Sequence, residues 1–454
     1  MSTQIQEKKK EYPLLWWGKD EIRHFNGRPV DNCNLPYICR HIQYNPYLEP
    51  LDQSKYNESP LIFVSIYQAD DSISAFNKPE DLPPLKDVDA GKKAWILYGW
   101  EAPKWFEQKK TAVINKFTYR FNYLPSSDFV YPYFDSSIFD IILSPPPATL
   151  EYKKAMQKEG FNGGEKLAPI AWIVSNCHSF NGREYYVYQL QKYIKIDIYG
   201  HCSNRNRDWP THADGTSLTD LEITSAYRFY LAFENSNCDF YVTEKLKRTY
   251  EAATIPIVDG PNDYGPFAAT HNALIQADQY SPKQLAALVK ELDGNDEKYQ
   301  ERLQYKYPKD PTHKPTVNDL SPVFVRQWTN RNQSADYLSW PPVYDESMCR
   351  SCKLAHDVSE GIVKLDPTKR LAPDASCLQK KHYHFTWVME YHWRWVLLAL
   401  TLIAMISFAL YRKRRTWVPR VRAKLLQRWH SGKDYIPLPA FMNDSKSLNS
   451  LWRN

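Results

Sequence analysis

The sequence predicts an α/β fold with two domains, and three observations support this prediction. The chain has 454 residues, which is too long for one small domain and long enough for two. Short apolar runs of strand length alternate with helical patterns between residues 153 and 344. Proline-rich stretches at 79–85 and 145–147 separate this region from an earlier one. Because alternating strands and helices form mostly parallel, doubly wound sheets, we expect that architecture here.

The first predicted domain covers residues 12–150 and follows a polar, lysine-rich segment, 1–11, that we expect to be disordered. Apolar runs at 61–67 and 94–98 predict buried strands. A further apolar patch at 14–17 is too short for a signal peptide, so the sequence leaves open how this region would enter the secretory pathway.

The second predicted domain covers residues 151–345 and shows a clear alternation of strands and helices. Strands are predicted at 169–174, 194–199, 229–233, 255–258 and 273–277, and helices at 183–193, 243–253 and 282–292. The polar segments that follow these strands would meet at the carboxyl edge of the sheet. Open α/β sheets bind ligands at that edge, near helix N-termini.

The last part of the chain is predicted to anchor the protein in a membrane. Residues 346–394 resemble a cysteine-containing stalk, and 395–411 predict a transmembrane helix with interfacial aromatic residues on both sides. A buried core helix is the alternative for the same run. The basic segment 412–454 would be a cytoplasmic tail, which places the body of the protein in the lumen.

The distribution of charge argues against nucleic acid as a partner. The formal net charge is +6, and residues 412–428 alone carry eight Lys or Arg. The rest of the chain is close to neutral, whereas nucleic-acid binding requires a basic face on the folded domain. No spacing of aspartates or cysteines predicts a metal site.

The cysteines and sequons fit a secreted or lumenal protein. The even number of cysteines favours disulfides, at Cys33, Cys39, Cys177, Cys202, Cys238, Cys349, Cys352 and Cys377. Asn57 and Asn332 each begin an Asn-x-Ser sequon, so both are candidate glycosylation sites.

The residues best suited to bind a ligand lie at 229–246. The predicted strand ends at Phe233, and Thr243 is placed to cap the next helix, with Glu244 and Lys245 in its first turn. A glutamate can accept bonds from ribose hydroxyls, and a lysine beside it can neutralise a phosphate. The spacing by itself favours a capped surface helix with a pair of adjacent charges.

These residues resemble a known family. The runs Phe233-Glu-Asn235, Tyr241-Val-Thr-Glu-Lys245 and Ile255-Pro-Ile-Val258 are similar to the donor-binding signature of the α1,3/4-fucosyltransferases, glycosyltransferase family 10. The resemblance implies a GT-B fold, in which two Rossmann-like domains face each other across a cleft. It also implies inverting transfer of L-fucose from GDP-fucose, in α1,3 linkage, to a GlcNAc of an N-glycan core or of N-acetyllactosamine.

The resemblance assigns roles to individual residues. The implied donor-binding residues are Ser175, Asn176, Arg183, Glu234, Asn235, Tyr241, Glu244 and Lys245. Among these, Glu244 would hold the ribose hydroxyls, and Lys245 and Arg183 the phosphates. Because arginine and lysine can stabilise the leaving diphosphate, we expect no bound cofactor and no requirement for a divalent metal.

The predicted catalytic base is Glu101, in the first domain. The run Trp100-Glu-Ala-Pro103 resembles the family's Glu-Ser-Pro segment and departs from it at Ala102. The glutamate would accept the proton of the acceptor hydroxyl as that oxygen attacks the sugar. Glu107 is the nearby alternative.

The resemblance also implies a disulfide pattern. Cys33 and Cys39 would pair with Cys349 and Cys352, and Cys177 with Cys202. Bonds within the local pairs, 33–39 and 349–352, are the alternative.

Three other interpretations of the sequence stay open. In the first, the chain belongs to a protein O-fucosylating branch of the family, and its acceptor is a serine or threonine of a protein. Alternatively, the chain is an inactive membrane protein that binds GDP-fucose or glycans, in which case Glu101 would not face the donor domain. A third interpretation is a tail-anchored cytoplasmic protein with free thiols. The leading prediction remains a single-pass enzyme of the Golgi or ER–Golgi membrane with a lumenal catalytic domain.

Overall fold

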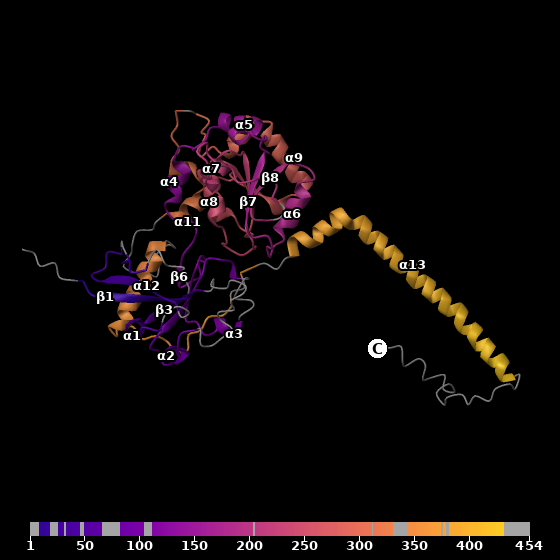
Figure 1. The fold of residues 1–454 in the computed structure, drawn as a ribbon, viewed down its shortest axis with the longest axis horizontal. Coiled ribbons are helices and arrows are strands. Elements are labelled where there is room, and N and C mark those ends of the chain that lie inside the picture. Colours follow the sequence, from indigo (N-terminus) through magenta and orange to yellow (C-terminus); the bar gives the residue numbers. More distant parts are fainter. Residues whose placement is uncertain are drawn as a thin grey trace, which may run out of the picture. The chain divides into compact units, whose positions relative to one another are not determined.

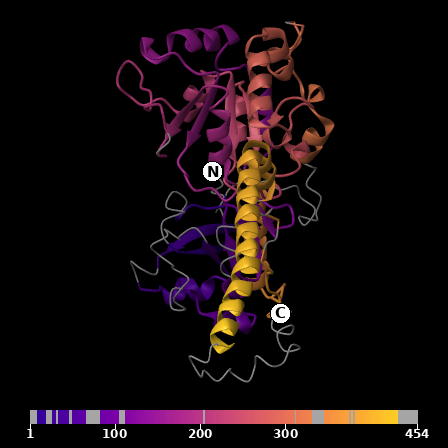
Figure 2. The same ribbon diagram turned by 90° about the vertical axis from the view of Figure 1, so that its right-hand side faces the viewer.

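A computed structural model describes most of the chain. The described residues are 9–18, 26–30, 33–45, 50–65, 82–103, 111–202, 205–310, 312–329, 344–373, 376–377 and 381–430. They divide into two compact units, 1–383 and 384–454. The first unit contains two separate parallel sheets flanked by helices (Figures 1 and 2), as the alternation of strands and helices predicts.

The N-terminal sheet has six strands among the described residues, all parallel, in the order β2-β1-β3-β4-β5-β6. The predicted strands at 61–67 and 94–98 correspond to two of them. The strands are β1 (Glu11–Trp17), β2 (Ile38–Tyr44), β3 (Leu61–Ser65), β4 (Ala94–Tyr98), β5 (Tyr119–Asn122) and β6 (Phe129–Val130).

The apolar patch at 14–17 is explained by its place in this sheet. It forms most of β1, which lies between β2 and β3 and is buried on both faces. Strands covered on both faces are continuously apolar rather than alternating. Residues 1–8 of the segment predicted to be disordered lie outside the described residues, and β1 begins at Glu11.

Helices from distant parts of the chain cover the two faces of the N-terminal sheet. Helix α12 (Tyr344–Ser359) packs on one face through Met348, Cys352 and Ala355. The opposite face packs against α1 (Gln53–Glu58), α2 (Leu85–Asp89) and the residues after α3 (Thr111–Ile114). Helix α12 lies mostly in the region predicted to be a stalk. It instead completes the core of the N-terminal domain.

Two disulfides attach α12 to this sheet. Cys33 is bonded to Cys349, and Cys39, on β2, is bonded to Cys352. This is the pairing that the family resemblance implies, and the local pairs 33–39 and 349–352 are not formed. The reason is that α12 packs on the sheet that contains Cys39 on β2, and Cys33 lies five residues before that strand.

The C-terminal sheet has five described strands, also parallel, in the order β11-β10-β9-β7-β8. They are β7 (Ile170–Val174), β8 (Ile196–Gly200), β9 (Phe229–Phe233), β10 (Ile255–Asp259) and β11 (Ile275–Gln276). The first strand, β7, has its successors on both sides, so the winding direction reverses between β7 and β9. Ligands of open α/β sheets bind at such a point.

Helices flank the C-terminal sheet on both faces (Figure 1). On one side, α6 (Arg183–Leu190) packs against α9 (Pro282–Asp293), and on the other α7 (Asp220–Ser225) packs against α8 (Glu244–Glu251). The remaining helices of this unit are α4 (Ile138–Leu143), α5 (Leu150–Glu159), α10 (Asp296–Arg302) and α11 (Pro322–Trp328).

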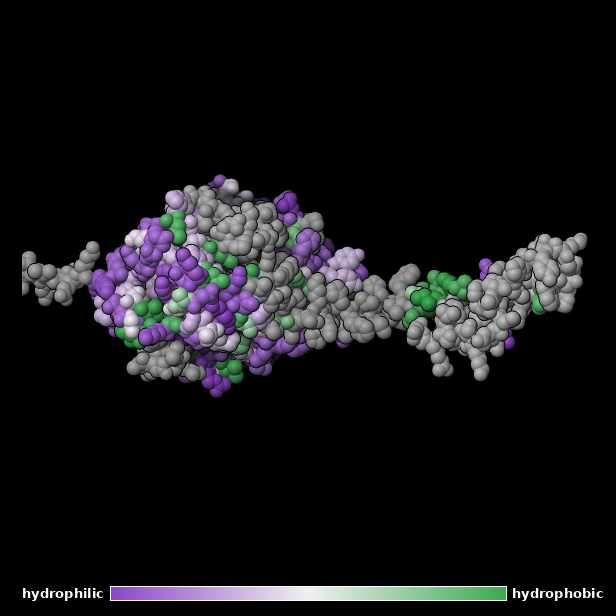
Figure 3. Space-filling model, turned by 90° about the horizontal axis from the view of Figure 1, so that it is seen from below, coloured by the Kyte–Doolittle hydropathy of each residue, from purple (hydrophilic) through white to green (hydrophobic). Residues whose placement is uncertain are grey.

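The prediction of a transmembrane helix at 395–411 is wrong. This region lies in α13 (Lys381–His430), and among the described residues no helix is long and apolar enough to cross a membrane. The uncharged run 395–410 is sixteen residues long, whereas a bilayer requires about 20, and the helix continues directly into Arg412 and Lys413. Large apolar side chains of this run, including Leu402, Ile406 and Phe408, are exposed. Hydrophobic residues are visible on the surface of the protein in Figure 3.

The attachment of α12 gives a stability prediction. Removing both bonds with Cys33→Ala, Cys39→Ala, Cys349→Ala and Cys352→Ala together should lower the free energy of unfolding by about 2–5 kcal/mol, because these bonds close loops across 316 and 313 residues. Denaturant unfolding followed by tryptophan fluorescence measures this loss. The control is Cys177→Ala/Cys202→Ala, whose loop spans 25 residues and which should cost less. Equal losses in the two variants would contradict the prediction.

Candidate functional site

The predicted site residues gather at the carboxyl ends of three strands. Ser175, Asn176 and Arg183 follow β7, and the segment 234–245 follows β9. Glu101 follows β4 of the N-terminal sheet. The structure brings the loop after β4 into contact with the loop after β9, so the two domains contribute to one site.

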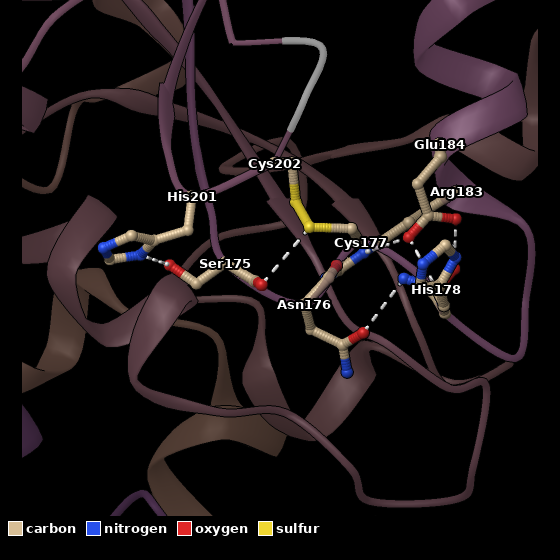
Figure 4. Close-up of a disulfide and its surroundings, with 9 residues drawn as sticks. Ser175, Asn176, Cys177, His178, Arg183, Glu184, His201 and Cys202 are labelled. Atoms are coloured by element: carbon tan, nitrogen blue, oxygen red, sulfur yellow. Dashed lines mark hydrogen bonds and ion pairs between the residues drawn. A yellow bond between two sulfur atoms is a disulfide. The ribbon is translucent and has the colours of Figure 1, made fainter.

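A disulfide joins the loops after β7 and β8 (Figure 4). Cys177 is bonded to Cys202, and beside this bond Ser175 Oγ lies 3.1 Å from His201 Nδ1. Asn176 Oδ1 accepts a bond from the backbone N–H of His178. These contacts hold the loop before α6 in one conformation.

Arg183 is buried beneath the site rather than exposed in it. It follows Gly182, whose φ of 74° lies in the left-handed region that favours glycine. Only 2% of Arg183 is exposed, and its guanidinium donates to Phe233 O at 2.6 Å and Asn176 O at 3.0 Å. The side chain therefore links the ends of β7 and β9 and places a positive charge under the loops.

Glu234 organises the start of α8. It is 1% exposed, and its Oε1 accepts bonds from the backbone N–H and the hydroxyl of Thr243, at 2.8 and 3.0 Å. Its Oε2 accepts from Lys245 Nζ at 3.1 Å. The carboxylate thus takes the capping role that the sequence assigned to the Thr243 side chain, because a negative charge is stabilised at a helix N-terminus.

Glu244 and Lys245 are the accessible charges at this helix end. Their side chains are 54% and 21% exposed, and the ammonium lies 3.2 Å from the Glu244 carboxylate. Burial opposes the charged form of Glu244, but the Lys245 ammonium outweighs it and holds the pKa of Glu244 below its ordinary value. For Lys245, the carboxylates of Glu234 and Glu244 outweigh burial and raise its pKa. Both groups are therefore charged at neutral pH, as hydroxyl and phosphate recognition requires.

A buried carboxylate at the end of β10 was missed as a site residue. Asp259 is 3% exposed, and its two oxygens accept from Asn237 Nδ2 at 3.1 Å and Asn181 Nδ2 at 3.3 Å. Asn181 also donates to Glu234 O. This network connects the loops after β7, β9 and β10. Its one signal in the sequence is the acid immediately after a buried apolar strand.

Glu101 faces the donor-side loop. Its Oε2 accepts bonds from the Tyr241 hydroxyl at 2.6 Å and from Asn235 Nδ2 at 3.1 Å. The next residue, Ala102, is fully buried in a cluster with Tyr123 and Tyr241, which accounts for a small side chain there. The competing residue Glu107 lies outside the described residues.

Cys238 and Cys377 form a fourth disulfide that the sequence analysis left unassigned. In addition, the backbone N–H of Asp239 donates to Ser376 O. The loop after β9 is therefore attached to the end of the segment that follows α12. Pairing could not be deduced from sequence, since these cysteines are 139 residues apart.

Several other predictions bear on this site. In the described part of the chain, no group of three His, Cys, Asp or Glu side chains is arranged to hold a metal ion. Independence from divalent metals stays a prediction. Asn57 is exposed on α1, whereas Asn332 lies outside the described residues.

The fold and site define a two-domain α/β protein whose charged and hydrogen-bonding groups converge at the carboxyl edges of parallel sheets. Residues 164–364 match the family described as glycosyltransferase family 10 (fucosyltransferase), C-terminal part. The matched region contains the C-terminal sheet and helix α12.

Similar proteins carry related names. The chain is 34% identical over 209 residues to GDP-fucose protein O-fucosyltransferase 3 of Xenopus tropicalis, covering 45% of this chain and 42% of that protein. It is 33% identical over 219 residues to glycoprotein 3-alpha-L-fucosyltransferase A of Drosophila melanogaster, covering 47% and 40%. The matched part thus spans less than half the length of either relative.

Solved structures show a weaker likeness. An α1,3-fucosyltransferase crystallised with GDP has a TM-score of 0.43 and 15% identity, over 79% of this chain and 93% of that one. The fold is assigned from the two parallel sheets themselves.

The burial of Arg183 predicts a structural cost for its removal. Arg183→Ala should lower the free energy of unfolding by about 2–5 kcal/mol, because the buried Phe233 carbonyl and the part-buried Asn176 carbonyl lose their donor. Urea denaturation measures the change. Tyr188→Ala, at a 58% exposed position of the same helix, is the control and should alter stability little. A fully stable Arg183→Ala variant would show that the guanidinium does not hold these loops.

Proposed function

We propose that this chain transfers L-fucose from GDP-fucose to an acceptor hydroxyl, with inversion at the anomeric carbon. The observation that carries the proposal is the contact of Glu101 with the loop that contains the family's donor signature. A carboxylate of one domain beside the donor loop of the other is the arrangement that base-assisted transfer requires. The family match and the names of the relatives supply the donor.

The donor half of the mechanism uses the charges around the start of α8. Glu244 accepts hydrogen bonds from the ribose hydroxyls, and Lys245 lies against the diphosphate. Arg183 adds positive charge from below the loops. Oriented cations stabilise the charge that develops on the leaving diphosphate.

The chemical step couples proton transfer to glycosyl transfer. The acceptor oxygen attacks C1 of fucose from the face opposite the diphosphate, and its proton passes to Glu101. The bond between C1 and the phosphate oxygen breaks with its electron pair going to GDP. The transition state has oxocarbenium character, as in glycoside hydrolysis.

For the acceptor, we propose a GlcNAc hydroxyl of an N-glycan core or of N-acetyllactosamine, in α1,3 linkage. A serine or threonine of a folded protein is the second candidate. The second candidate is favoured by the relatives named protein O-fucosyltransferase 3, and the first by the glycoprotein 3-alpha-L-fucosyltransferase.

We further propose that the chain works in the ER–Golgi lumen. Among the described residues, four disulfides are formed and no cysteine is free. Disulfides of this kind persist in oxidising compartments. Exposed Asn57 is available there for glycosylation.

The first test is an assay of fucose transfer. Radiolabelled GDP-fucose is incubated with the chain and a panel of acceptors: a core N-glycan, N-acetyllactosamine and folded secreted domains. We expect label on one acceptor class. No transfer to any of them, with GDP-fucose still bound, would contradict the proposed enzyme and favour a binding protein.

Glu101→Gln should abolish transfer, because an amide cannot accept the proton, with a loss on the order of 10²–10⁴-fold. GDP affinity, measured by calorimetry, should change little because the residue lies on the other domain. Turnover equal to that of the unaltered chain would remove Glu101 as the base.

Lys245→Ala should weaken GDP binding on the order of tenfold or more, through loss of a charge-assisted contact to phosphate. Lys247→Ala, on the same helix and of the same charge, is the matched control and should bind GDP normally. If the two variants bind GDP equally well, Lys245 does not contact the diphosphate.

A further inference from the structure

Two hydrogen bonds cross from the donor-binding domain to the predicted base. Tyr241 donates its hydroxyl to Glu101 Oε2 at 2.6 Å, and Asn235 donates its amide N–H to the same oxygen at 3.1 Å. Two donors on one carboxylate oxygen fix the rotation of the carboxylate about its last side-chain bond. The orientation of the group therefore depends on a loop of the opposite domain.

The Tyr241 hydroxyl is suited to hold this carboxylate permanently. The side chain is 1% exposed and packs against Tyr123, with ring centroids 5.2 Å apart. Burial first, and the Glu101 charge second, raise the pKa of Tyr241 well above its ordinary value. The phenol thus keeps its proton and acts as a donor. A buried phenol already bonded to Glu101 is poorly placed to contact a donor sugar.

The backbone around Tyr241 is held in an uncommon conformation. Phe240 has a φ of 58°, in the left-handed region that non-glycine residues rarely adopt. Tyr241 N–H donates to Cys238 O, and Val242 N–H to Phe240 O, which closes a tight turn. Such conformations persist where the surrounding structure enforces them, and they cluster at active sites.

A covalent link to the other domain enforces this turn. Cys238, three residues before Tyr241, is bonded to Cys377. The segment that leads to Cys377 is anchored on the N-terminal domain, where Arg370 pairs with Asp89 and Leu371 N–H donates to Phe117 O. The loop that contacts Glu101 is therefore tethered to the domain that carries Glu101.

We propose that Tyr241 is a positioning residue for the catalytic base, and that its principal role is to orient the Glu101 carboxylate rather than to bind the donor. Asn235 provides the second bond, and the Cys238–Cys377 bond keeps the loop in place. This inference rests on the proposed function of Glu101. It changes the role that the family resemblance implies for Tyr241.

The test separates orientation of the base from donor binding. Tyr241→Phe removes only the hydroxyl, and kcat should fall on the order of 10- to 100-fold, as expected for a misplaced catalytic group. The KM for GDP-fucose and the Kd for GDP should stay within about twofold of those of the unaltered chain. An increase in KM and Kd with kcat unchanged would overturn the inference and make Tyr241 a donor contact.

The matched control is Tyr250→Phe. Tyr250 is also fully buried, and its hydroxyl donates to Phe267 O at 2.6 Å and accepts from the Ala269 N–H at 3.1 Å. This variant loses buried hydrogen bonds that do not involve Glu101, so its stability should fall while kcat stays the same. An equal loss of kcat in the two variants would show that any buried hydroxyl has this effect and would overturn the positioning role.

A stability cycle tests the contact without relying on activity. Tm is measured for the full chain with Tyr241→Phe, with Glu101→Ala, and with both. If the hydroxyl holds this carboxylate, the two single losses do not add, because each removes the same bond. Additive losses would overturn the inference. Absence of fucose transfer by the unaltered chain would instead refute the proposed function, and the cycle would still decide whether the contact exists.

Discussion

The return of residues 344–377 to the N-terminal domain is the constraint on which the site depends. Helix α12 completes the core of the first sheet, and two disulfides attach it there. The chain then passes over the same domain to Cys377, which is bonded to the loop after β9. Without this return, no disulfide would link the loop after β9 to the domain that contains β4.

Electrostatics at the start of α8 explains how exposed charges are kept ready for a ligand. Glu234 is buried and accepts bonds from Thr243 and Lys245, so it neutralises the helix N-terminus from below. Its negative charge keeps the Lys245 ammonium protonated, and that ammonium in turn keeps Glu244 ionised. The accessible pair is thus supported by a carboxylate that is only 1% exposed. Arg183 supports the loops in a similar way, from a buried position.

The burial of these groups separates two kinds of residue within one sequence signature. Glu244 and Lys245 present their side chains to solvent, as binding residues should. Glu234 and Tyr241 belong to the same signature, and Arg183 was assigned to donor binding with them, yet all three are almost completely buried and bonded to other parts of the protein. A family motif therefore contains residues that hold the site together as well as residues that contact a ligand. Only distances and exposure distinguish them.

The sequence by itself determined the α/β rhythm of the C-terminal domain, because strands such as 229–233 and helices such as 282–292 are specified by local apolar spacing. It also determined which loops carry polar groups. Strand β1 was not predicted, because its apolar residues reflect burial between β2 and β3 rather than a local pattern. The transmembrane helix was predicted wrongly from an apolar run of sixteen residues.

Only the tertiary structure decided the contact of Tyr241 with Glu101, which joins residues 140 positions apart, and the pairing of Cys238 with Cys377. Both depend on how two sheets and a returning segment pack, and no local pattern encodes such packing.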